Sequence, residues 1–202
     1  MNNNMFSLFF VVAASLLLSA CSDENQPADQ SPSSQQQSQP VQITSLPLKN
    51  PSFEQSDQFV KGWGFSQHAG EPAYEVSIDT TDSTDGKHSY RIERKLVQAW
   101  GMINQWLPLD SAVGKSIKLS AMVKSEALGP KGFDLSLVFR KANKKFISEI
   151  SSEIVTGTHG WQRLEVAAVV PARTAHLQIT AVLNDAGTAW LDDVQLTLID
   201  KQ

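Results

Sequence analysis

Cysteine is nearly absent from this sequence, which has one such residue, Cys21, in 202 positions. A single cysteine excludes an intrachain disulfide and any metal site that needs several thiolates. Basic charge is not in excess either. From Lys49 to the end the chain has 17 basic and 18 acidic residues (21 minus the 3 that precede Lys49), so the net charge there is -1. Because phosphate contacts need clustered Lys and Arg, we expect no nucleic-acid partner.

Sequence motifs of catalysis are also missing. None of the four histidines has the HExxH or HxH spacing of a metal site or the context of a nucleophile elbow. Glu149 and Glu153 are two carboxylates close in sequence, but the surrounding pattern predicts an exposed, weak strand. A general acid needs a pocket that raises its pKa, so the sequence predicts that the chain is not an enzyme.

The chain opens with an apolar segment, Met5–Ala20. This segment is shorter than the roughly 20 residues of a transmembrane helix, and we assign residues 1–20 to a signal peptide. Its end, Leu18–Ser19–Ala20–Cys21, resembles the lipobox of bacterial lipoproteins, in which the cysteine becomes acylated and N-terminal. The resemblance implies a membrane anchor of palmitate and related acyl chains on Cys21. Ser22 after the cysteine implies the outer membrane under the sorting rule of that family. The alternative is an uncleaved anchor helix, because residues 1–4 contain no Lys or Arg.

Residues 21–42 form the next segment, which is rich in Ser, Gln, Pro and acidic residues. Ala28 and Val41 are its apolar residues after Cys21, so the segment cannot bury enough surface to offset the entropy of ordering. We predict a disordered linker here. A glutamine-rich aggregating segment is the alternative, which the prolines disfavour.

From residue 43 to 202 the sequence predicts one all-β domain. Short alternating segments recur at about ten-residue spacing with polar turns between them, and no segment has a convincing helical period. Residues 116–124 alternate strictly, which is typical of strands with one face in a core and one in water. The pattern predicts an antiparallel jelly-roll β-sandwich, and roughly 150 residues are enough for its core.

The final strand, residues 189–198, places two carboxylates side by side in an apolar run. Strict alternation puts Trp190, Asp192 and Val194 on one face, which we expect to be the core face, and Leu191 and Asp193 on the other. A carboxylate on a core face costs several kcal/mol unless it is paired, hydrogen-bonded or bound to a metal. We therefore expect a specific partner for Asp192.

Three groups of motifs follow one another along this domain. Asn50–Glu54 and Gly62–Trp63 come first, Asp85–Ile92 leads into a strand, and Trp161–Pro171 and Trp190–Leu196 come last. Together they resemble the carbohydrate-binding modules of families 4, 9 and 22, which belong to the galactose-binding-domain-like jelly rolls. The resemblance covers essentially the whole domain and implies that fold and the binding of carbohydrate.

The resemblance also implies a metal site. In these families a structural calcium often joins the N-terminal segment to the last strand. Its ligands here would be Glu54, a backbone carbonyl near Lys87, and Asp192 or Asp193. Hard oxygen ligands suit Ca²⁺. The alternative is that backbone N–H groups, or an Arg or Lys side chain, hold Asp192.

Carbohydrate modules bind sugars through aromatic faces and through groups that hydrogen-bond to hydroxyls. By the resemblance, we expect the tryptophans at 63, 161 and 190 to be core residues. In residues 100–107, alternation places Trp100, Asn104 and Trp106 on one face and Ile103 and Leu107 on the other. If Ile103 and Leu107 face the core, the two tryptophans and the amide point outward; the reverse register would bury them.

Polar residues of two other segments can join this face. We name Arg140, His176 and Gln178 as further candidate ligand-binding residues. The basic stretch that begins at Arg140 is itself typical of a solvated hairpin turn.

The leading prediction is therefore a lipid-anchored, non-catalytic module that recognises a glycan at the bacterial cell envelope. The alternative is an envelope lipoprotein that binds a protein partner through the same sandwich. A flat exposed apolar patch of several hundred Å² would favour the protein partner.

Overall fold

The computed structural model describes residues 41–55 and 60–201. The predicted signal peptide, Cys21 and most of the predicted linker lie outside these residues. Within them, no helix has the length and apolar character needed to cross a bilayer. Apart from one short 3-10 helix, η1, the regular elements are β-strands: β1 Val41–Ser45, β2 Gly64–Gln67, β3 Tyr74–Asp79, β4 Ser89–Arg94, β5 Gly101–Pro108, η1 Asp110–Ala112, β6 Ser116–Arg140, β7 Phe146–Ser151, β8 Val155–Val169, β9 His176–Leu183 and β10 Thr188–Lys201.

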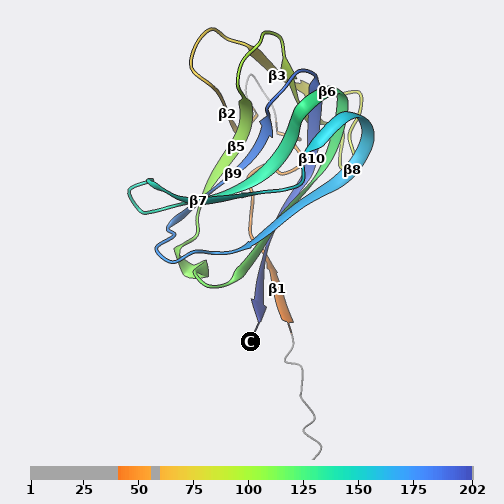
Figure 1. The fold of residues 1–202 in the computed structure, drawn as a ribbon. Coiled ribbons are helices and arrows are strands. Elements are labelled where there is room, and N and C mark those ends of the chain that lie inside the picture. The colour runs from red at the N-terminus through yellow and green to blue at the C-terminus, as the bar shows by residue number, and fades with distance from the viewer. Residues whose placement is uncertain (1–40, 56–59, 202) are drawn as a thin grey trace, which may run out of the picture. The chain divides into compact units, whose positions relative to one another are not determined.

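The strands form an antiparallel jelly-roll sandwich, as the sequence predicts (Figure 1). What we call the first sheet has the order β2-β5-β9-β6-β7, and the second sheet has the order β3-β4-β10-β6-β8. β1 lies beside the last residues of β10, beyond the part that pairs with β4. β1 begins at Val41 and so includes two residues that the sequence assigns to the linker.

β6 belongs to both sheets. Its residues 116–126 pair with β10 and β8, whereas residues 133–140 pair with β9 and β7. Between them the chain turns through Ala127 and Gly132, which both have positive φ. A Cβ on Gly132 would lie 2.1 Å from the carbonyl oxygen of Val155, so only glycine fits there. The sequence indicates two separate strands in this stretch, and the structure joins them into one.

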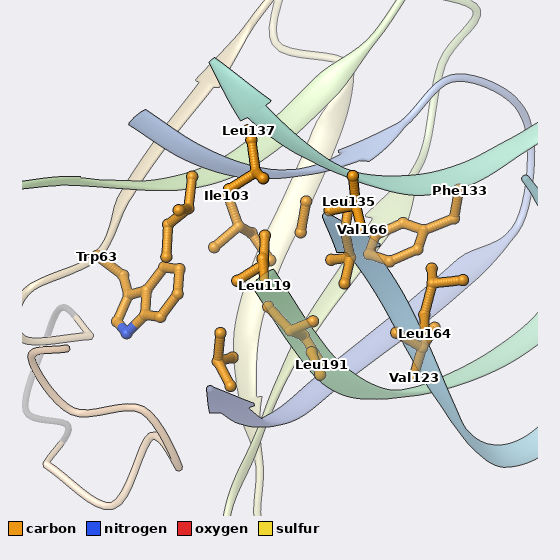
Figure 2. Close-up of a cluster of buried hydrophobic side chains, with 14 of the residues drawn as sticks. Trp63, Ile103, Leu119, Val123, Phe133, Leu135, Leu137, Leu164, Val166 and Leu191 are labelled. Atoms are coloured by element: carbon orange, nitrogen blue, oxygen red, sulfur yellow. The ribbon is translucent and has the colours of Figure 1, made fainter. Parts of the chain in front are cut away.

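The core lies between the two sheets (Figure 2). Leu119 and Val123 reach it from the second sheet, and Ile103 and Leu137 reach it from the first; all four are fully buried. Complete burial of an aliphatic side chain of this size contributes about 1.5–3 kcal/mol relative to exposure. Alternation in β6 thus matches the predicted inward and outward faces, and β5 has the one of its two open registers that turns Ile103 inward.

The last strand departs from simple alternation. The register of β10 against β6 shifts between Asp192 and Gln195, and Asp193 has a φ of 44°. This β-bulge inserts an extra residue, so Leu191 and Val194 both face the core although an even alternation would separate them. The predicted placement of Asp192 on the core face is therefore wrong. Asp192 lies on the outer face of the second sheet, where a loop covers it.

Of the three tryptophans expected in the core, one is there. Trp63 packs against Phe53 with a ring-centroid distance of 5.3 Å. Trp161 and Trp190 instead lie on the outer face of the second sheet, where their indole N–H groups donate to Asp82 (3.0 Å) and Asp79 (2.8 Å). The segment that follows β3 therefore covers this outer face.

Candidate functional site

The opening segment, the 79–88 loop and the last strand meet at one corner of the domain, which we call the closing corner. Glu54 Oε1 accepts the backbone N–H groups of Lys87 (2.7 Å) and His88 (2.8 Å). These hydrogen bonds, the one from Lys87 foremost, hold the pKa of Glu54 below its ordinary value of 4.5. The hydroxyl of Ser52 donates to Asp85 in the same loop, at 2.5 Å.

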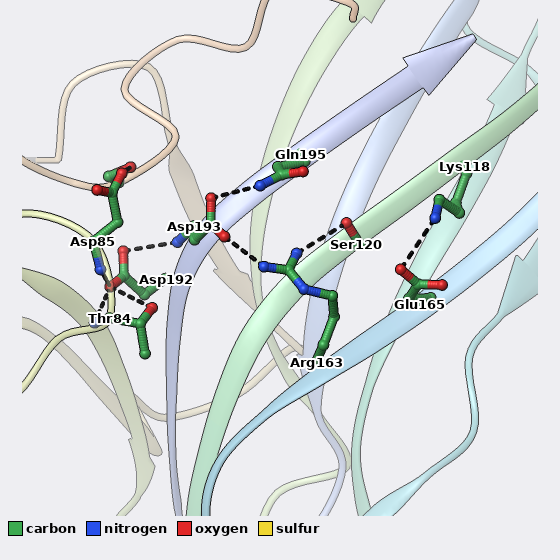
Figure 3. Close-up of polar contacts among 10 residues, drawn as sticks. Thr84, Asp85, Lys118, Ser120, Arg163, Glu165, Asp192, Asp193 and Gln195 are labelled. Atoms are coloured by element: carbon green, nitrogen blue, oxygen red, sulfur yellow. Dashed lines mark hydrogen bonds and ion pairs between the residues drawn. The ribbon is translucent and has the colours of Figure 1, made fainter. Parts of the chain in front are cut away.

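Asp192 is fully buried at this corner, with an exposed fraction of 0%. Its Oδ2 accepts the backbone N–H groups of Thr84 (2.6 Å) and Asp85 (2.8 Å) and the Thr84 hydroxyl (3.0 Å), as Figure 3 shows. Its Oδ1 accepts the N–H of Asp193 at 2.7 Å. A buried carboxylate with this many donors is stabilised as an anion without any cation.

Asp193 has different partners. Its Oδ2 accepts Arg163 Nη2 at 2.6 Å and its Oδ1 accepts Gln195 Nε2 at 2.8 Å (Figure 3). Arg163 also donates to the hydroxyl of Ser120 across the strand. The two adjacent carboxylates thus point to separate partners: Asp192 to the loop, and Asp193 to the exposed face of the sheet.

The structure brings Glu54, the backbone of Lys87 and the Asp pair to the same corner, as the resemblance implies. Among the described residues, however, no three His, Cys, Asp or Glu side chains gather in a way that could hold a metal ion. The groups around Asp192 are N–H and O–H donors, which suit an anion. The residues as they lie do not form a calcium cage. Calcium stays a prediction, which the melting temperature with and without a chelator tests.

The outer face of the first sheet carries an open cleft of about 310 Å³. Side chains from four adjacent strands line it, together with one residue before β5 and one after β9, because alternate residues of each strand point to this face. They are Trp100, Met102, Val138, Arg140, Phe146, Glu149, Gln178, Thr180, Val182 and Asn184.

Of the two registers that the sequence leaves open for β5, the structure shows the one with Ile103 toward the core. Ile103 is fully buried, and Trp106 is 41% exposed on the opposite face. Trp100 is half-buried and lines one part of the cleft. Asn104 shares this face but is 8% exposed, and its amide donates to Gly64 O and Ser66 Oγ at 3.3 Å. Asn104 therefore holds β2 against β5, and it does not line the cleft.

The three other candidates lie at the same end of the sheet as Trp106. The Arg140 guanidinium lies over the Trp106 ring, 5.1 Å from its centroid, and Arg140 Nε donates to Gln178 Oε1 at 3.1 Å. His176 pairs with both Arg140 and Pro108 in the sheet. Arg140 and Gln178 line the cleft, whereas His176 lies next to it.

Sequence reasoning missed several residues of the cleft. Phe146 and Glu149 come from β7, which the sequence indicates as a weak strand with no assigned face. Thr180 and Asn184 share the face of Gln178 by alternation along the chain, so the pattern contained the signal for them. The register that brings β7 beside β6 is a long-range feature that alternation alone does not give.

Two buried polar groups lie in or beneath the cleft. Thr180 is 4% exposed, and its hydroxyl has no hydrogen-bond partner among the described residues. Asp134 is buried opposite Val182, one outward-facing position further along the sheet, and accepts hydrogen bonds from Asn184 (2.8 Å) and Ser136 (3.0 Å). Burial raises the pKa of Asp134 above its ordinary value of 3.8. The floor of the cleft is thus polar and incompletely satisfied.

Comparison with solved structures finds the same fold in proteins of different activities. The enzymatically active domain of tailspike protein 4 from bacteriophage CBA120 is 16% identical, with a TM-score of 0.60, over 74% of this chain and 21% of that one. The chain thus spans about a fifth of that protein's length. A Stig cyclase from Fischerella sp. TAU, solved with an indole compound, is 13% identical, with a TM-score of 0.58, over 78% of this chain and 98% of that one.

A carbohydrate-binding module has the same fold. The family 22 xylan-binding domain from Paenibacillus barcinonensis is 18% identical, with a TM-score of 0.53, over 73% of this chain and 90% of that one. No protein-family model matches the chain, and the search of curated proteins found no match. At these identities the likenesses show the jelly-roll fold and leave the activity to be argued from the site.

Proposed function

We propose that this domain binds a carbohydrate in the cleft on the first sheet. The observation that carries the proposal is the partly exposed Trp106 ring next to the cleft, together with one cleft hydroxyl that has no partner among the described residues. Trp106 is 41% exposed and Trp100 lines the cleft, so aromatic rings can pack against the apolar C–H face of a sugar. The unpartnered hydroxyl of Thr180 and the amide of Asn184 can bond to sugar hydroxyls.

The likeness to the xylan-binding domain is in line with this proposal, since nearly the whole length of that module is matched by this chain. The Stig cyclase is matched over its length as well, so the fold alone does not separate binding from catalysis. We base the choice of binding on the chemistry of the cleft.

We also propose that the bound sugar is released without chemical change. Hydrolysis of a glycosidic bond uses a pair of carboxyl groups that flank the bond. Among the described residues that line the cleft, Glu149 is the one carboxylate, while Asp134 lies beneath the surface and is bonded to Asn184 and Ser136. Mass spectrometry of an oligosaccharide after long incubation with the protein tests this point, and the appearance of shorter fragments would contradict it.

A glycan array probed with the full chain in detergent tests the binding proposal. We expect binding to at least one glycan, lost in Trp106→Ala and largely kept in Trp106→Phe, because phenylalanine keeps an aromatic face. The replacement of an exposed ring leaves the fold intact, which the melting temperature checks. Absence of binding across the array, or binding that ignores Trp106→Ala and Trp100→Ala, would contradict the proposal.

A protein partner is the second candidate function, and one observation favours it. Phe146, Ile150 and Ile154 lie on β7 and the chain after it, and they are 56%, 44% and 58% exposed. Phe146 faces the cleft, whereas Ile150 pairs with the core residue Leu137 and lies on the other face of the strand. Exposed apolar side chains on an edge strand are a common feature of protein interfaces. Cross-linking in intact cells with a photoreactive residue at Ile150 tests it. A specific cross-linked protein supports this function, and its absence contradicts it.

For the cellular location, we propose that acyl chains on Cys21 anchor the protein in the bacterial outer membrane. The support is the lipobox-like sequence Leu18–Cys21 and Ser22 after it. Metabolic labelling with a palmitate analogue tests the anchor: wild-type protein should take up label and Cys21→Ser should not. Fractionation of the two membranes tests the location, and recovery of the labelled protein in the inner membrane would contradict it.

A further inference from the structure

Five basic side chains near one end of the cleft have no acidic partner. They are Arg140, Lys141, Lys144, Lys145 and Arg173, and none of them forms an ion pair within the described part of the chain. Most basic residues elsewhere are paired, as in Lys118 with Glu165 (3.1 Å) and Arg163 with Asp193 (2.6 Å), and the described lysines without an ion pair, at 49, 87 and 131, are far apart in the sequence. The positive charge that is not paired is therefore concentrated at this end of the cleft.

Backbone contacts fix the position of this basic cluster. Lys141 and Lys145 close the turn between β6 and β7 with a hydrogen bond of 2.9 Å, and Lys144 donates to the carbonyl of Lys141 at 2.8 Å. The carbonyl of Arg140 accepts the N–H of Ala175, which ties the turn that contains Arg173 to the same edge. The five charges thus come from two tight turns that lie side by side.

Arg140 connects the basic cluster to the cleft. Its Nε donates to Gln178 and its Nη1 to the carbonyl of Lys144, while the guanidinium covers the Trp106 ring. Lys144 Nζ lies 5.9 Å from the centroid of the same ring. Nη2 of Arg140 has no acceptor within the described residues. A sugar that packs on Trp106 would therefore lie next to a positioned guanidinium with a free donor.

The acidic groups near the cleft lie elsewhere. Glu149 lines the cleft and pairs with Val138 of β6. Val138 is the next outward-facing residue of β6 before Arg140. Asp134 is buried and precedes Val138 by four residues in β6, and Asp110 is exposed in η1. The charge thus changes across the sheet, from positive beside Trp106 to negative on the β7 side of the cleft, because Glu149 lies in the same row as Val138, Gln178 and Trp106.

We propose that the glycan carries a carboxylate, as a uronic acid does, and that Arg140 and Lys144 bind this group beside Trp106. This inference rests on the proposed carbohydrate binding and names the class of sugar. A guanidinium donates two parallel N–H bonds to a carboxylate, and Lys144 adds a second positive charge. Glu149 repels a second carboxylate on the β7 side of the cleft, so the sugar there is neutral and bonds through its hydroxyls.

The test pairs acidic oligosaccharides with their own neutral forms. Oligogalacturonate, an alginate oligosaccharide and glucuronoxylan are each titrated into the full chain in detergent, before and after chemical reduction of their carboxyl groups to alcohols. We expect at least one acidic form to bind about tenfold more tightly than its reduced form at low salt. The difference should shrink as salt rises, since exposed charges are screened over about 10 Å at 0.1 M.

Three variants test which residues produce the preference for the acidic oligosaccharide. Arg140→Met keeps a long apolar side chain over Trp106 and should remove most of the preference for the acidic form. Arg140→Lys should keep part of it. Lys118→Met removes the same charge from the second sheet and should leave the preference unchanged, because Lys118 does not line the cleft. Melting temperatures of all three variants check that the fold is kept.

The outcomes separate this inference from the proposed function. Equal binding of acidic and reduced forms keeps carbohydrate binding and overturns the carboxylate. A preference that survives Arg140→Met overturns the assigned residues. A preference for sulfated over carboxylated oligosaccharides overturns the carboxylate in favour of another anion. If no oligosaccharide binds but vesicles with anionic lipid do, the basic cluster contacts a membrane surface and both proposals fail.

Discussion

The closing corner and the cleft are both rich in polar groups, but the carboxylates of the corner are more fully hydrogen-bonded than the polar groups of the cleft. At the corner, Asp192 accepts four hydrogen bonds and Glu54 accepts two from the backbone, although the buried Nδ1 of His88, 3.3 Å from Glu54 Oε2, has no hydrogen-bond partner among the described residues. In the cleft, the Thr180 hydroxyl has no partner, and Arg140 has no acidic partner within the described residues. A satisfied group contributes to folding, whereas an unsatisfied group costs free energy that a ligand can recover. We therefore expect the closing corner to contribute mainly to the stability of the domain and the cleft to contribute mainly to ligand binding.

The largest effect should come from the corner. Asp192→Ala leaves the backbone N–H groups of Thr84, Asp85 and Asp193 without their acceptor inside the fold. We expect the free energy of unfolding to fall by about 3 kcal/mol or more, since each buried unsatisfied donor costs about 1–3 kcal/mol. Urea unfolding measures it. Asp200→Ala, which breaks a half-exposed pair with Lys115, is the control and should cost under about 1 kcal/mol. Similar losses in the two variants would contradict the assignment.

The matching change beside the cleft should affect binding and not folding. Trp106→Ala removes a ring that is 41% exposed. We expect about tenfold weaker binding of a glycan found on the array, which corresponds to about 1.4 kcal/mol, and a change in unfolding free energy under about 0.5 kcal/mol. Isothermal titration and urea unfolding give the two numbers. A large loss of stability with intact binding would reverse the roles of the two regions.

The pH dependence of stability should have opposite signs in the two regions. Glu54 has a pKa held below 4.5 in the folded state by the N–H of Lys87, so its stabilisation is present above that value and is lost as the pH falls through the lower folded pKa. Asp134 has a pKa raised above 3.8 by burial, so the protein loses stability as the pH rises from 3.8 through the higher folded pKa.

Two variants isolate these contributions. We expect the stability difference between wild type and Glu54→Gln to increase with pH across the acid range. The difference between wild type and Asp134→Asn should decrease with pH. Chemical unfolding from pH 3 to 7 measures both curves. Parallel curves of the same sign would show that the two carboxyl groups lie in similar environments, which contradicts their contacts.

The smallest effect is expected at Thr180. Thr180→Val replaces a buried hydroxyl that has no partner with a methyl group of similar size. Stability should stay the same or rise by up to about 1 kcal/mol, because no hydrogen bond is lost and no polar group stays buried. Glycan affinity should fall a few-fold. Ser136→Ala, which removes a hydroxyl that bonds to Asp134, is the contrasting control and should destabilise the domain. A loss of stability in Thr180→Val would show that its hydroxyl has a partner.

Local alternation grouped the residues of β5 correctly but left its register open. In residues 100–107 it places Ile103 and Trp106 on opposite faces, and the structure shows that Ile103 is the one in the core. The same rule fails in β10, because the bulge at Asp193 inserts one residue and exchanges the faces after it. A non-glycine residue with positive φ has no clear sequence signature, so this exchange, and the outer position of Trp190, were not predictable.

Long-range strand pairing was the second feature that could not be predicted from the sequence. Phe146 and Glu149 enter the cleft because β7 pairs with the second half of β6, and that half is reached only after the chain turns at Gly132. Neither the turn nor the register follows from the spacing of apolar residues. The basic stretch from Arg140 to Lys145 is a hairpin turn, as the sequence indicates, but its position beside Trp106 came from the fold.

The most direct test of the division between cleft and corner is a map of where a glycan binds. Backbone and indole N–H signals are followed by NMR while an oligosaccharide selected on the array is added to isotope-labelled protein. The account predicts shifts at the Trp106 indole, Thr180 and Arg140, with Thr84, Asp85 and Asp193 unchanged. Shifts confined to the closing corner, with the Trp106 indole unmoved, would contradict it.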